Sequence, residues 1–313
     1  MQDFIFIALG LVLLVLGGNW LLKSAVALSL RLNIPKIIIG MTVVSFATST
    51  PELIVSVSAA IEGFPDLALG NVIGSNIANL ALVLGIIIIL GPIDVRKSFY
   101  ITDWPVMMVA SLLLFVFIFF DGVLVRYEGV IMVAALFLFL IYLLRYQKPA
   151  VVEEVEVEAV NPLPLHKAVL YLGIGAAALW GGSELLITGA VGLATFYEVS
   201  ERIIGVTIVS IGTSIPELAA SLIAIIKKEK AISLGNLIGS NIFNILAVLG
   251  ITSMITPIQV IDQGLLSSDI LWMLGVSFLI LPLVFLPKGL RLGWRDGMVL
   301  LLAYAAFLYF TLH

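Results

Sequence analysis

Two closely similar segments place oxygen-bearing side chains inside long apolar stretches. One reads Thr-Ser-Thr-Pro-Glu over residues 48–52, and the other reads Thr-Ser-Ile-Pro-Glu over residues 213–217. A carboxylate inside a membrane costs about 3 kcal/mol unless it is paired or hydrated, so Glu52 and Glu217 are candidate functional groups. The sequence has no Lys or Arg at the membrane depth of these two glutamates. Lys23 is the nearest candidate, and its side chain is expected to extend to the inner face. We therefore predict that a bound cation supplies the compensating charge, with two protonated structural carboxyls as the alternative.

A proline stands directly before each of these carboxylates. Pro51 and Pro216 have no N–H, and the ring of each clashes with the carbonyl four residues earlier. The helix should therefore open there and release the carbonyls of Ala47 and Gly212. Non-helical carbonyls at membrane depth are tolerated around a cavity or an ion, and Ca²⁺ takes six to eight oxygens from carboxylates, carbonyls and water. The pattern predicts a cation site, with a kink that serves only helix packing as the alternative.

A second pair of segments adds hydroxyl and amide groups. Gly-Asn-Val-Ile-Gly-Ser-Asn-Ile-Ala-Asn over residues 70–79 matches Gly-Asn-Leu-Ile-Gly-Ser-Asn-Ile-Phe-Asn over residues 235–244. In each segment a Ser and an Asn four residues apart share one helix face, and such neutral oxygens suit Na⁺. The glycines allow close helix packing. The remaining amides are interpreted as hydrogen-bond partners between helices and not as ligands: Asn71, Asn76, Asn236 and Asn241.

The spacing between the paired segments predicts an internal duplication. Both pairs are separated by the same 165 residues, as from Glu52 to Glu217, and this offset holds without a gap from Gly40 to Ile93. Five predicted spans in each half give the second copy the opposite orientation across the membrane, and inverted repeats carry the central sites of many secondary transporters. Asn19 and Glu184, at equivalent positions of the two halves, are expected to act beside the site or in gating, or to form a helix contact.

Apolar stretches separated by charges, Pro and Gly position these segments. A spanning helix needs about 20 apolar residues, and ten stretches qualify: 4–30, 36–61, 67–90, 103–120, 124–145, 168–195, 203–226, 231–256, 268–286 and 295–312. The predicted fold class is all-α integral membrane, with ten transmembrane helices as two inverted five-helix repeats.

Fourteen of the 16 Lys and Arg fall on one side of this arrangement. The positive-inside rule makes that side cytoplasmic and places the N- and C-termini outside.

Three regions are predicted along the chain. Residues 1–146 form the first half with five transmembrane helices, residues 147–166 form a cytoplasmic acidic linker, and residues 167–313 form the second half with five more. The linker alternates Val and Glu and is interpreted as a solvated connector, with a calcium-sensing strip as the alternative. Its carboxylates are Glu153, Glu154, Glu156 and Glu158.

Composition limits the other functions. Hydrophobic residues make up 61% of the 313 positions and charged residues 12%, against roughly 25% charged in soluble domains, so the chain needs a lipid bilayer around it. The net charge of −4 and the lack of a basic cluster exclude nucleic acid as a partner. The absence of Cys excludes thiol chemistry, and the two His, at predicted helix ends, suit neither a zinc site nor a midplane catalytic base. Neither an enzyme, nor a cofactor, nor an obligate protein partner is predicted.

The paired segments resemble the two α-repeats of sodium/calcium exchangers in the calcium/cation antiporter superfamily, and the likeness is greatest to the compact prokaryotic members. The resemblance covers the whole ten-helix plan. It implies a multi-pass protein of the cell membrane that exchanges three Na⁺ for one Ca²⁺ by alternating access at a midplane site. Such unequal exchange is electrogenic, because two ionised carboxylates balance one Ca²⁺ and leave one net positive charge with three Na⁺.

The resemblance also implies a set of metal ligands around four central cation sites. Glu52 and Glu217 would bind Ca²⁺ together with the backbone carbonyls of Thr48 and Thr213. Sodium sites on either side would use the side chains of Ser49, Ser75, Ser214 and Ser240 with the carbonyls of Ser45 and Ser210, and the amides of Asn79 and Asn244 would flank the middle site.

Two features depart from the family pattern. Asn244 stands where some prokaryotic and potassium-dependent relatives carry Asp, which leaves two carboxylates at the middle site. Ser45 and Ser210 stand where Ala is familiar, and their hydroxyls could alter ion preference. A proton- or potassium-coupled calcium exchanger is therefore the alternative within the class, and a cation channel is the alternative outside it. The proton/calcium branch resembles the chain less, because its signature reads Gly-Asn-Ala-x-Glu.

Overall fold

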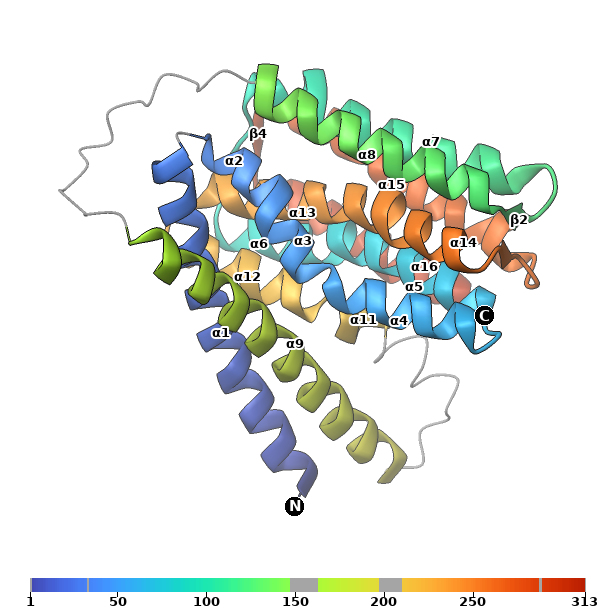
Figure 1. Ribbon diagram of the computed structural model, residues 1–313, viewed down its shortest axis with the longest axis horizontal. Helices are drawn as coiled ribbons and strands as arrows, with labels where there is room; N and C mark the ends of the chain where they lie inside the picture. The colour runs from blue at the N-terminus through green and yellow to red at the C-terminus, as the bar shows by residue number, and fades with distance from the viewer. Residues whose placement is uncertain (1, 33, 147–162, 197–209, 287–288, 313) are drawn as a thin grey trace. The chain divides into compact units, whose positions relative to one another are not determined.

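The computed structural model describes residues 2–32, 34–146, 163–196, 210–286 and 289–312 (Figure 1). Two predicted features lie wholly or partly outside these residues. The first is the acidic linker: only its residues 163–166 are described, and its four glutamates are not among them. The second is the start of the predicted seventh span, residues 203–209.

The helices follow the predicted spans to within a few residues, and several contain a π-helical segment (η). In chain order they are α1 (Gln2–Leu32), α2 (Lys36–Ile39), η1 (Gly40–Val44), α3 (Ser45–Thr48), α4 (Thr50–Ile61), α5 (Pro65–Ile77), η2 (Ala78–Val83), α6 (Leu84–Leu90), η3 (Phe99–Asp103), α7 (Trp104–Phe119), α8 (Arg126–Tyr146), α9 (Leu165–Phe196), α11 (Ser210–Thr213), α12 (Ile215–Ile226), α13 (Lys230–Phe243), η5 (Asn244–Leu249), α14 (Gly250–Ile255), η6 (Leu265–Asp269), α15 (Ile270–Phe285) and α16 (Trp294–Leu312). Two short antiparallel pairs of strands complete the described elements: β1 (Ile93–Asp94) with β4 (Arg291–Leu292), and β2 (Val123–Leu124) with β3 (Ile258–Gln259).

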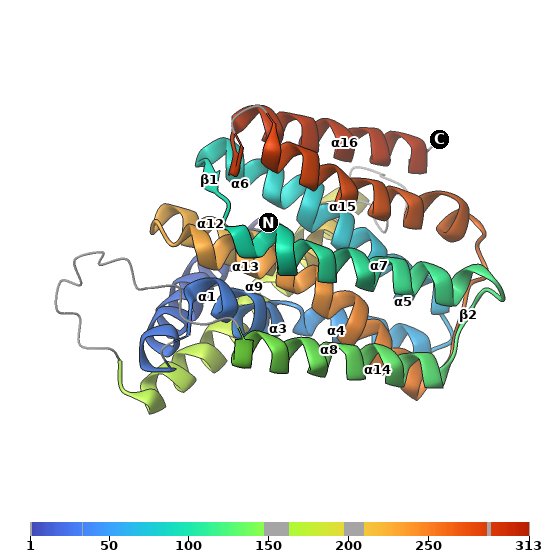
Figure 2. The ribbon, with the colours of Figure 1, turned by 90° about the horizontal axis from the view of Figure 1, so that it is seen from above.

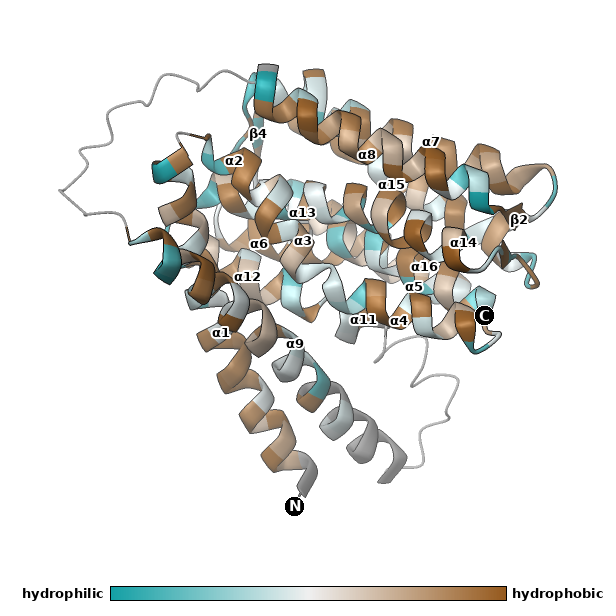
Figure 3. Cartoon of the chain, in the orientation of Figure 1, coloured by the Kyte–Doolittle hydropathy of each residue, from teal (hydrophilic) through white to brown (hydrophobic). Residues whose placement is uncertain are grey.

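The helices confirm a helical membrane protein. Within the described ranges, seven helices are long and apolar enough to cross a membrane, or eight if residues 36–48 and 50–61 make one span. The described part of the predicted seventh span, α12, is shorter, and α16 is not among the seven. Hydrophobic residues predominate along α7 and α8 (Figure 3). Large apolar side chains such as Val109 and Phe137 are exposed on these helices, as lipid-facing residues should be. The count of ten spans and their inverted arrangement stay predictions.

The chain forms two compact units that cut across the two halves of the sequence. The first unit comprises Met1–Thr48 and Phe139–Asn236, and the second comprises Ser49–Leu138 and Leu237–His313. Each unit therefore takes helices from both predicted repeats.

In the first unit, α1 and α9 lie side by side and antiparallel (Figure 1). Small residues recur at every seventh position of both helices along this contact. Gly10, Gly17 and Ser24 of α1 face Gly182, Gly175 and Ala168 of α9. Seven-residue spacing returns to nearly the same helix face, so the two backbones can stay close over several turns. The hydroxyl of Ser24 donates to the carbonyl of Ala168 at 2.7 Å.

Replacing Gly182 by Ala should destabilise the protein, whereas Gly181→Ala should not. A Cβ at position 182 would lie 2.9 Å from the carbonyl oxygen of Gly10 and 3.0 Å from the amide nitrogen of Leu14, and these backbone atoms cannot move without displacing α1. A Cβ at position 181 would meet nothing within 4 Å. Overpacking costs about 1–3 kcal/mol, so the Gly182 variant should unfold at a lower temperature than wild type in detergent. Identical unfolding temperatures for the two variants would contradict the close backbone contact.

In the second unit, α6 and η2 pack against α16, and α7 packs against α15 (Figure 2). The indole N–H of Trp104 donates to the carbonyl of Ser277 at 2.8 Å, and its ring lies 6.4 Å from that of Phe278. The side chains of α5 are largely buried, and Leu69 and Ile73 are at most 1% exposed. The helix that carries the second polar segment is therefore held on several sides by other helices.

Candidate functional site

Both carboxylate-bearing segments contain a break in the helix at a serine. Ser49, between α3 and α4, has φ −86° and ψ 5°, and Ser214, between α11 and α12, has φ −86° and ψ 0°. Each serine is followed by a helix with Pro in its first turn. The predicted opening of the helix is present at both positions, with nearly identical backbone geometry.

Glu52 and Glu217 lie in the first turns of α4 and α12. Both side chains are 0% exposed. Backbone N–H groups at the start of a helix stabilise negative charge, so the breaks give each carboxylate a favourable position inside an apolar span. Proline, carboxylate and helix start thus form one unit of structure that occurs twice in the chain.

The carbonyl released by Pro216 has a partner in the first unit. Ser183 of α9 donates its hydroxyl to the carbonyl of Gly212 at 2.7 Å, and the Ser183 side chain is buried. This bond joins α9 to the break before α12. The ligand implied by the resemblance is the next carbonyl, that of Thr213. Ser183 is not among the predicted site residues, because its repeat equivalent is Gly18, which has no hydroxyl.

Ser183→Ala should lower the stability of the protein by about 1–3 kcal/mol, because the buried Gly212 carbonyl would lose its donor. Ser111→Ala is the matched control. Ser111 is equally buried, but its hydroxyl donates to the carbonyl of Met107 four residues earlier in its own helix. Denaturation in detergent should therefore show the larger loss for Ser183→Ala, and equal losses would contradict a special role for this bond.

Side chains of α3 pack on α13 in the first unit. The Ser45 hydroxyl lies 2.8 Å from the carbonyl oxygen of Gly40 and 2.9 Å from that of Asn236. The Thr48 hydroxyl lies 3.2 Å from Oδ1 of Asn236 and 3.3 Å from the carbonyl oxygen of Ser45. Both hydroxyls therefore have partners within the protein, and the backbone carbonyls of Ser45 and Thr48 are the atoms implied as ligands. The side chain of Ser210, the repeat equivalent of Ser45, lies outside the described residues.

The duplication extends to individual hydrogen bonds. In the second unit, Nδ2 of Asn71 donates to Oγ of Ser56 at 3.1 Å. In the first unit, Nδ2 of Asn236 donates to Oγ of Ser221 at 3.0 Å. These bonds join equivalent residues and link α4 to α5 and α12 to α13. They confirm the interpretation of Asn71 and Asn236 as hydrogen-bond partners between helices.

The amides of Asn79 and Asn244 lie in matching π-helical segments of the second unit. Asn79 is in η2 and Asn244 begins η5, and both side chains are 0% exposed. Within the described part of the chain, Oδ1 of each has no hydrogen-bond partner. π-Helical turns occur frequently at functional sites. The sequence pattern did not predict these turns.

The structure distributes the implied ligands equally between the units. Ser45, Thr48, Ser210, Thr213, Ser214 and Glu217 belong to the first unit, and Ser49, Glu52, Ser75, Asn79, Ser240 and Asn244 belong to the second. In the second unit, α4 with Glu52 packs against both α5 and η5, which brings the elements that carry Glu52, Ser75 and Asn244 together. The described side chains contain no group of three or more His, Cys, Asp or Glu that could hold a metal ion. The available donors are therefore mainly hydroxyl, amide and carbonyl oxygens.

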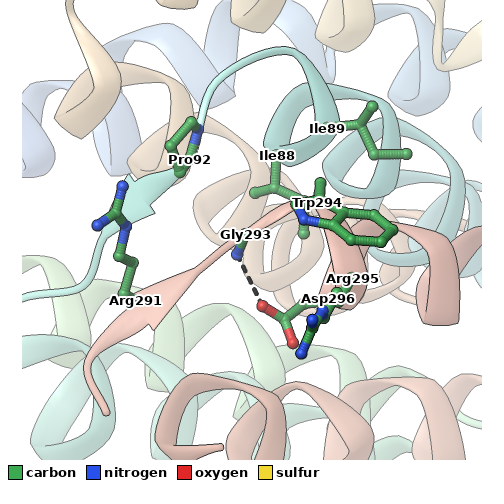
Figure 4. Close-up of a pocket in the computed structure, with 8 residues that line it drawn as sticks. All are labelled: Ile88, Ile89, Pro92, Arg291, Gly293, Trp294, Arg295 and Asp296. Atoms are coloured by element: carbon green, nitrogen blue, oxygen red, sulfur yellow. Dashed lines mark hydrogen bonds between the residues drawn. The ribbon is translucent and has the colours of Figure 1, made fainter. Parts of the chain in front are cut away.

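A separate cavity of about 360 Å³ lies in the second unit beside β4 and the start of α16 (Figure 4). The carboxylate of Asp296 accepts a hydrogen bond from the backbone N–H of Gly293 at 2.7 Å, and the guanidinium of Arg295 lies 5.6 Å from the ring centre of Trp294. None of the twelve implied ligands lines this cavity. Its chemistry is that of a capped helix start and not of a cation site.

Comparison with known proteins gives one family. Residues 3–145 and 167–313 match the model of a family described as sodium/calcium exchanger protein. The protein CaxA of Alkalimonas amylolytica, described as a putative antiporter, is 40% identical over 311 residues, which cover 97% of each chain. The sodium/calcium exchanger MaX1 of Methanosarcina acetivorans is 28% identical over an alignment that covers 98% of this chain and 97% of MaX1. A solved structure of the sodium-calcium exchanger NCX_Mj, soaked with Na⁺ and Sr²⁺, has a TM-score of 0.84 at 28% identity and covers 99% of both chains.

Proposed function

Because the chain belongs to the sodium/calcium exchanger family, we propose that it is a secondary active antiporter that exchanges Na⁺ for Ca²⁺ across the cell membrane by alternating access. The observation that carries the proposal is the pair of fully buried carboxylates, Glu52 and Glu217, each placed just after a helix break at equivalent positions of a duplicated sequence. Burying an ionised carboxylate inside a membrane costs free energy, and the positive charge of a bound cation offsets that cost.

In this proposal, Glu52 and Glu217 bind Ca²⁺ with the carbonyls of Thr48 and Thr213. The amides of Asn79 and Asn244 flank this middle site. In the other half of the cycle, Na⁺ binds on either side of it, at the side chains of Ser49, Ser75, Ser214 and Ser240 and the carbonyls of Ser45 and Ser210. Carboxylates, carbonyls and amides are the ligands that hard cations take in proteins. The exchange of three Na⁺ for one Ca²⁺ then carries one net positive charge per cycle.

The identity of the coupling ion is tested by ⁴⁵Ca²⁺ uptake into proteoliposomes loaded with Na⁺, with K⁺ or with a proton gradient. We expect ⁴⁵Ca²⁺ uptake only into the Na⁺-loaded vesicles. Uptake driven by K⁺ or by protons would contradict sodium coupling and favour the alternative exchangers. Uptake driven by voltage alone, with no counter-ion inside, would favour a cation channel instead.

Acidification should lower the apparent affinity for Ca²⁺. Carboxylates must be deprotonated to bind a metal ion, so protons compete with Ca²⁺ and binding releases protons. Calcium titration by calorimetry in buffers of different ionisation enthalpy should therefore give different heats on the acidic side of neutrality. Equal heats in all buffers at every pH would argue against direct ligation by Glu52 and Glu217.

A further inference from the structure

A series of buried amide hydrogen bonds in the second unit ends at one of the proposed ligands. Asn244 donates through Nδ2 to Oδ1 of Asn76 at 3.1 Å, and Asn76 donates through its own Nδ2 to the backbone carbonyl of Asn241 at 3.3 Å. Nδ2 of Asn76 also lies 3.9 Å from the sulfur of Met273. Each of the three asparagines is at most 1% exposed, so bulk water does not compete for these groups.

The direction of this series is fixed at its backbone end. The carbonyl of Asn241 can only accept, so Asn76 must turn its NH₂ group toward that carbonyl and its oxygen toward Asn244. Asn244 must then offer its own NH₂ group, because two facing amide oxygens would repel each other. The oxygen of Asn244 is thereby turned away from Asn76, and it accepts no hydrogen bond from any residue in the described ranges.

The repeat equivalent of Asn76 makes a different contact. Asn241 donates through Nδ2 to the carbonyl of Leu237, four residues earlier in its own helix, at 2.7 Å. Asn79, the repeat equivalent of Asn244, therefore has no amide neighbour that fixes it, and neither Nδ2 nor Oδ1 of Asn79 has a hydrogen-bond partner among the described residues. One of the two proposed amide ligands is held in a fixed orientation and the other is not.

We propose that Asn76 is a positioning residue that turns the side-chain oxygen of Asn244 toward the transported cation. The inference rests on the proposed function, in which Asn244 is a ligand. A hard cation binds only the oxygen of an amide, so a side chain that turned over would present its NH₂ group and repel the ion. An Asp at position 244 would present an oxygen in either orientation. Asn76 therefore matters because this chain has an amide at position 244.

A double-mutant cycle on the full-length protein in detergent separates orientation from packing. Asn76→Ala should weaken Ca²⁺ binding, measured by calorimetry, about tenfold when residue 244 is Asn, and by less than about threefold in the Asn244→Asp background. Loss of packing at position 76 is the same in both backgrounds, so the difference between the two factors reports orientation. Asn76→Leu, which preserves most of the side-chain volume, repeats the measurement if the Ala variant is not recovered folded.

The matched control is Asn241→Ala, which removes the equivalent side chain of the other repeat but keeps the backbone carbonyl. It should change the Ca²⁺ affinity by the same factor in the wild-type background and in the Asn244→Asp background. Equal factors for Asn76→Ala in the two backgrounds would overturn the inference, as would equally strong coupling of residue 241 to residue 244. Failure of the wild-type protein to bind Ca²⁺ would instead overturn the proposed function itself.

Discussion

Glu52→Gln and Glu217→Gln should each reduce Na⁺-dependent Ca²⁺ uptake by about 100-fold or more while the protein stays folded. Each substitution keeps the shape of the side chain and removes one of two fixed negative charges. A cation in a site shielded from water is sensitive to that change, and about 2.8 kcal/mol of lost interaction corresponds to a hundredfold loss of affinity. Initial rates of ⁴⁵Ca²⁺ uptake into Na⁺-loaded proteoliposomes measure the effect.

Glu62→Gln is the matched control for these variants. Glu62 directly follows α4, the helix that carries Glu52 in its first turn, but the Glu62 side chain is exposed. Uptake by this variant should be close to wild type. Transport at a near wild-type rate by either Glu52→Gln or Glu217→Gln would show that the assignment of the central Ca²⁺ site is wrong.

A disulfide between α1 and α12 should stop exchange, whereas a disulfide between α1 and α9 should permit it. The inverted repeat leads us to expect that the first and sixth helices move together, while the helices that carry the polar segments stay in place. A Cβ at Gly18 would touch Ile223 of α12, so Gly18→Cys with Ile223→Cys joins a moving helix to a fixed one. Ser24→Cys with Ala168→Cys joins the two moving helices to each other. The chain has no Cys of its own, so each pair is the only thiol pair present.

The crosslinked proteins should differ in transport and not in binding. Ca²⁺ titration of the protein crosslinked between positions 18 and 223 should still show binding, and a reductant should restore its exchange. Exchange that continues in a fully crosslinked sample of this pair would rule out α1 as the moving element. Loss of exchange in the Ser24/Ala168 pair would show that α1 and α9 move relative to each other.

Much of the fold could be predicted from the distribution of apolar residues. The length of each apolar stretch fixes the length of its helix, and charges and prolines mark its ends, so α1, α9 and α15 begin and end close to the predicted residues. The two helix breaks were also predictable, because the missing N–H of Pro51 and Pro216 acts locally. The number of membrane spans was harder to predict, because a count from hydropathy depends on whether the parts of a broken helix are counted as one span.

Side-chain contacts within the site could not be predicted in the same way. The hydroxyl of Ser183 bonds to the carbonyl of Gly212 in another helix, 29 residues further along the chain, and no local sequence pattern indicates that they are close. Asn76 and Asn241 occupy equivalent positions in matching sequences, yet one bonds to a neighbouring helix and the other to its own. The choice depends on which acceptor lies within reach in three dimensions. A repeat therefore predicts which residues correspond but not that they make the same contacts.

The central claim is that this chain exchanges Na⁺ for Ca²⁺ with net movement of charge. The most direct test is ⁴⁵Ca²⁺ uptake into Na⁺-loaded proteoliposomes whose membrane potential is set by a K⁺ gradient and valinomycin. If three Na⁺ leave for each Ca²⁺ that enters, an inside-positive potential should accelerate uptake and an inside-negative potential should slow it. Uptake that needs no internal Na⁺, or that does not change with the membrane potential, would contradict the account.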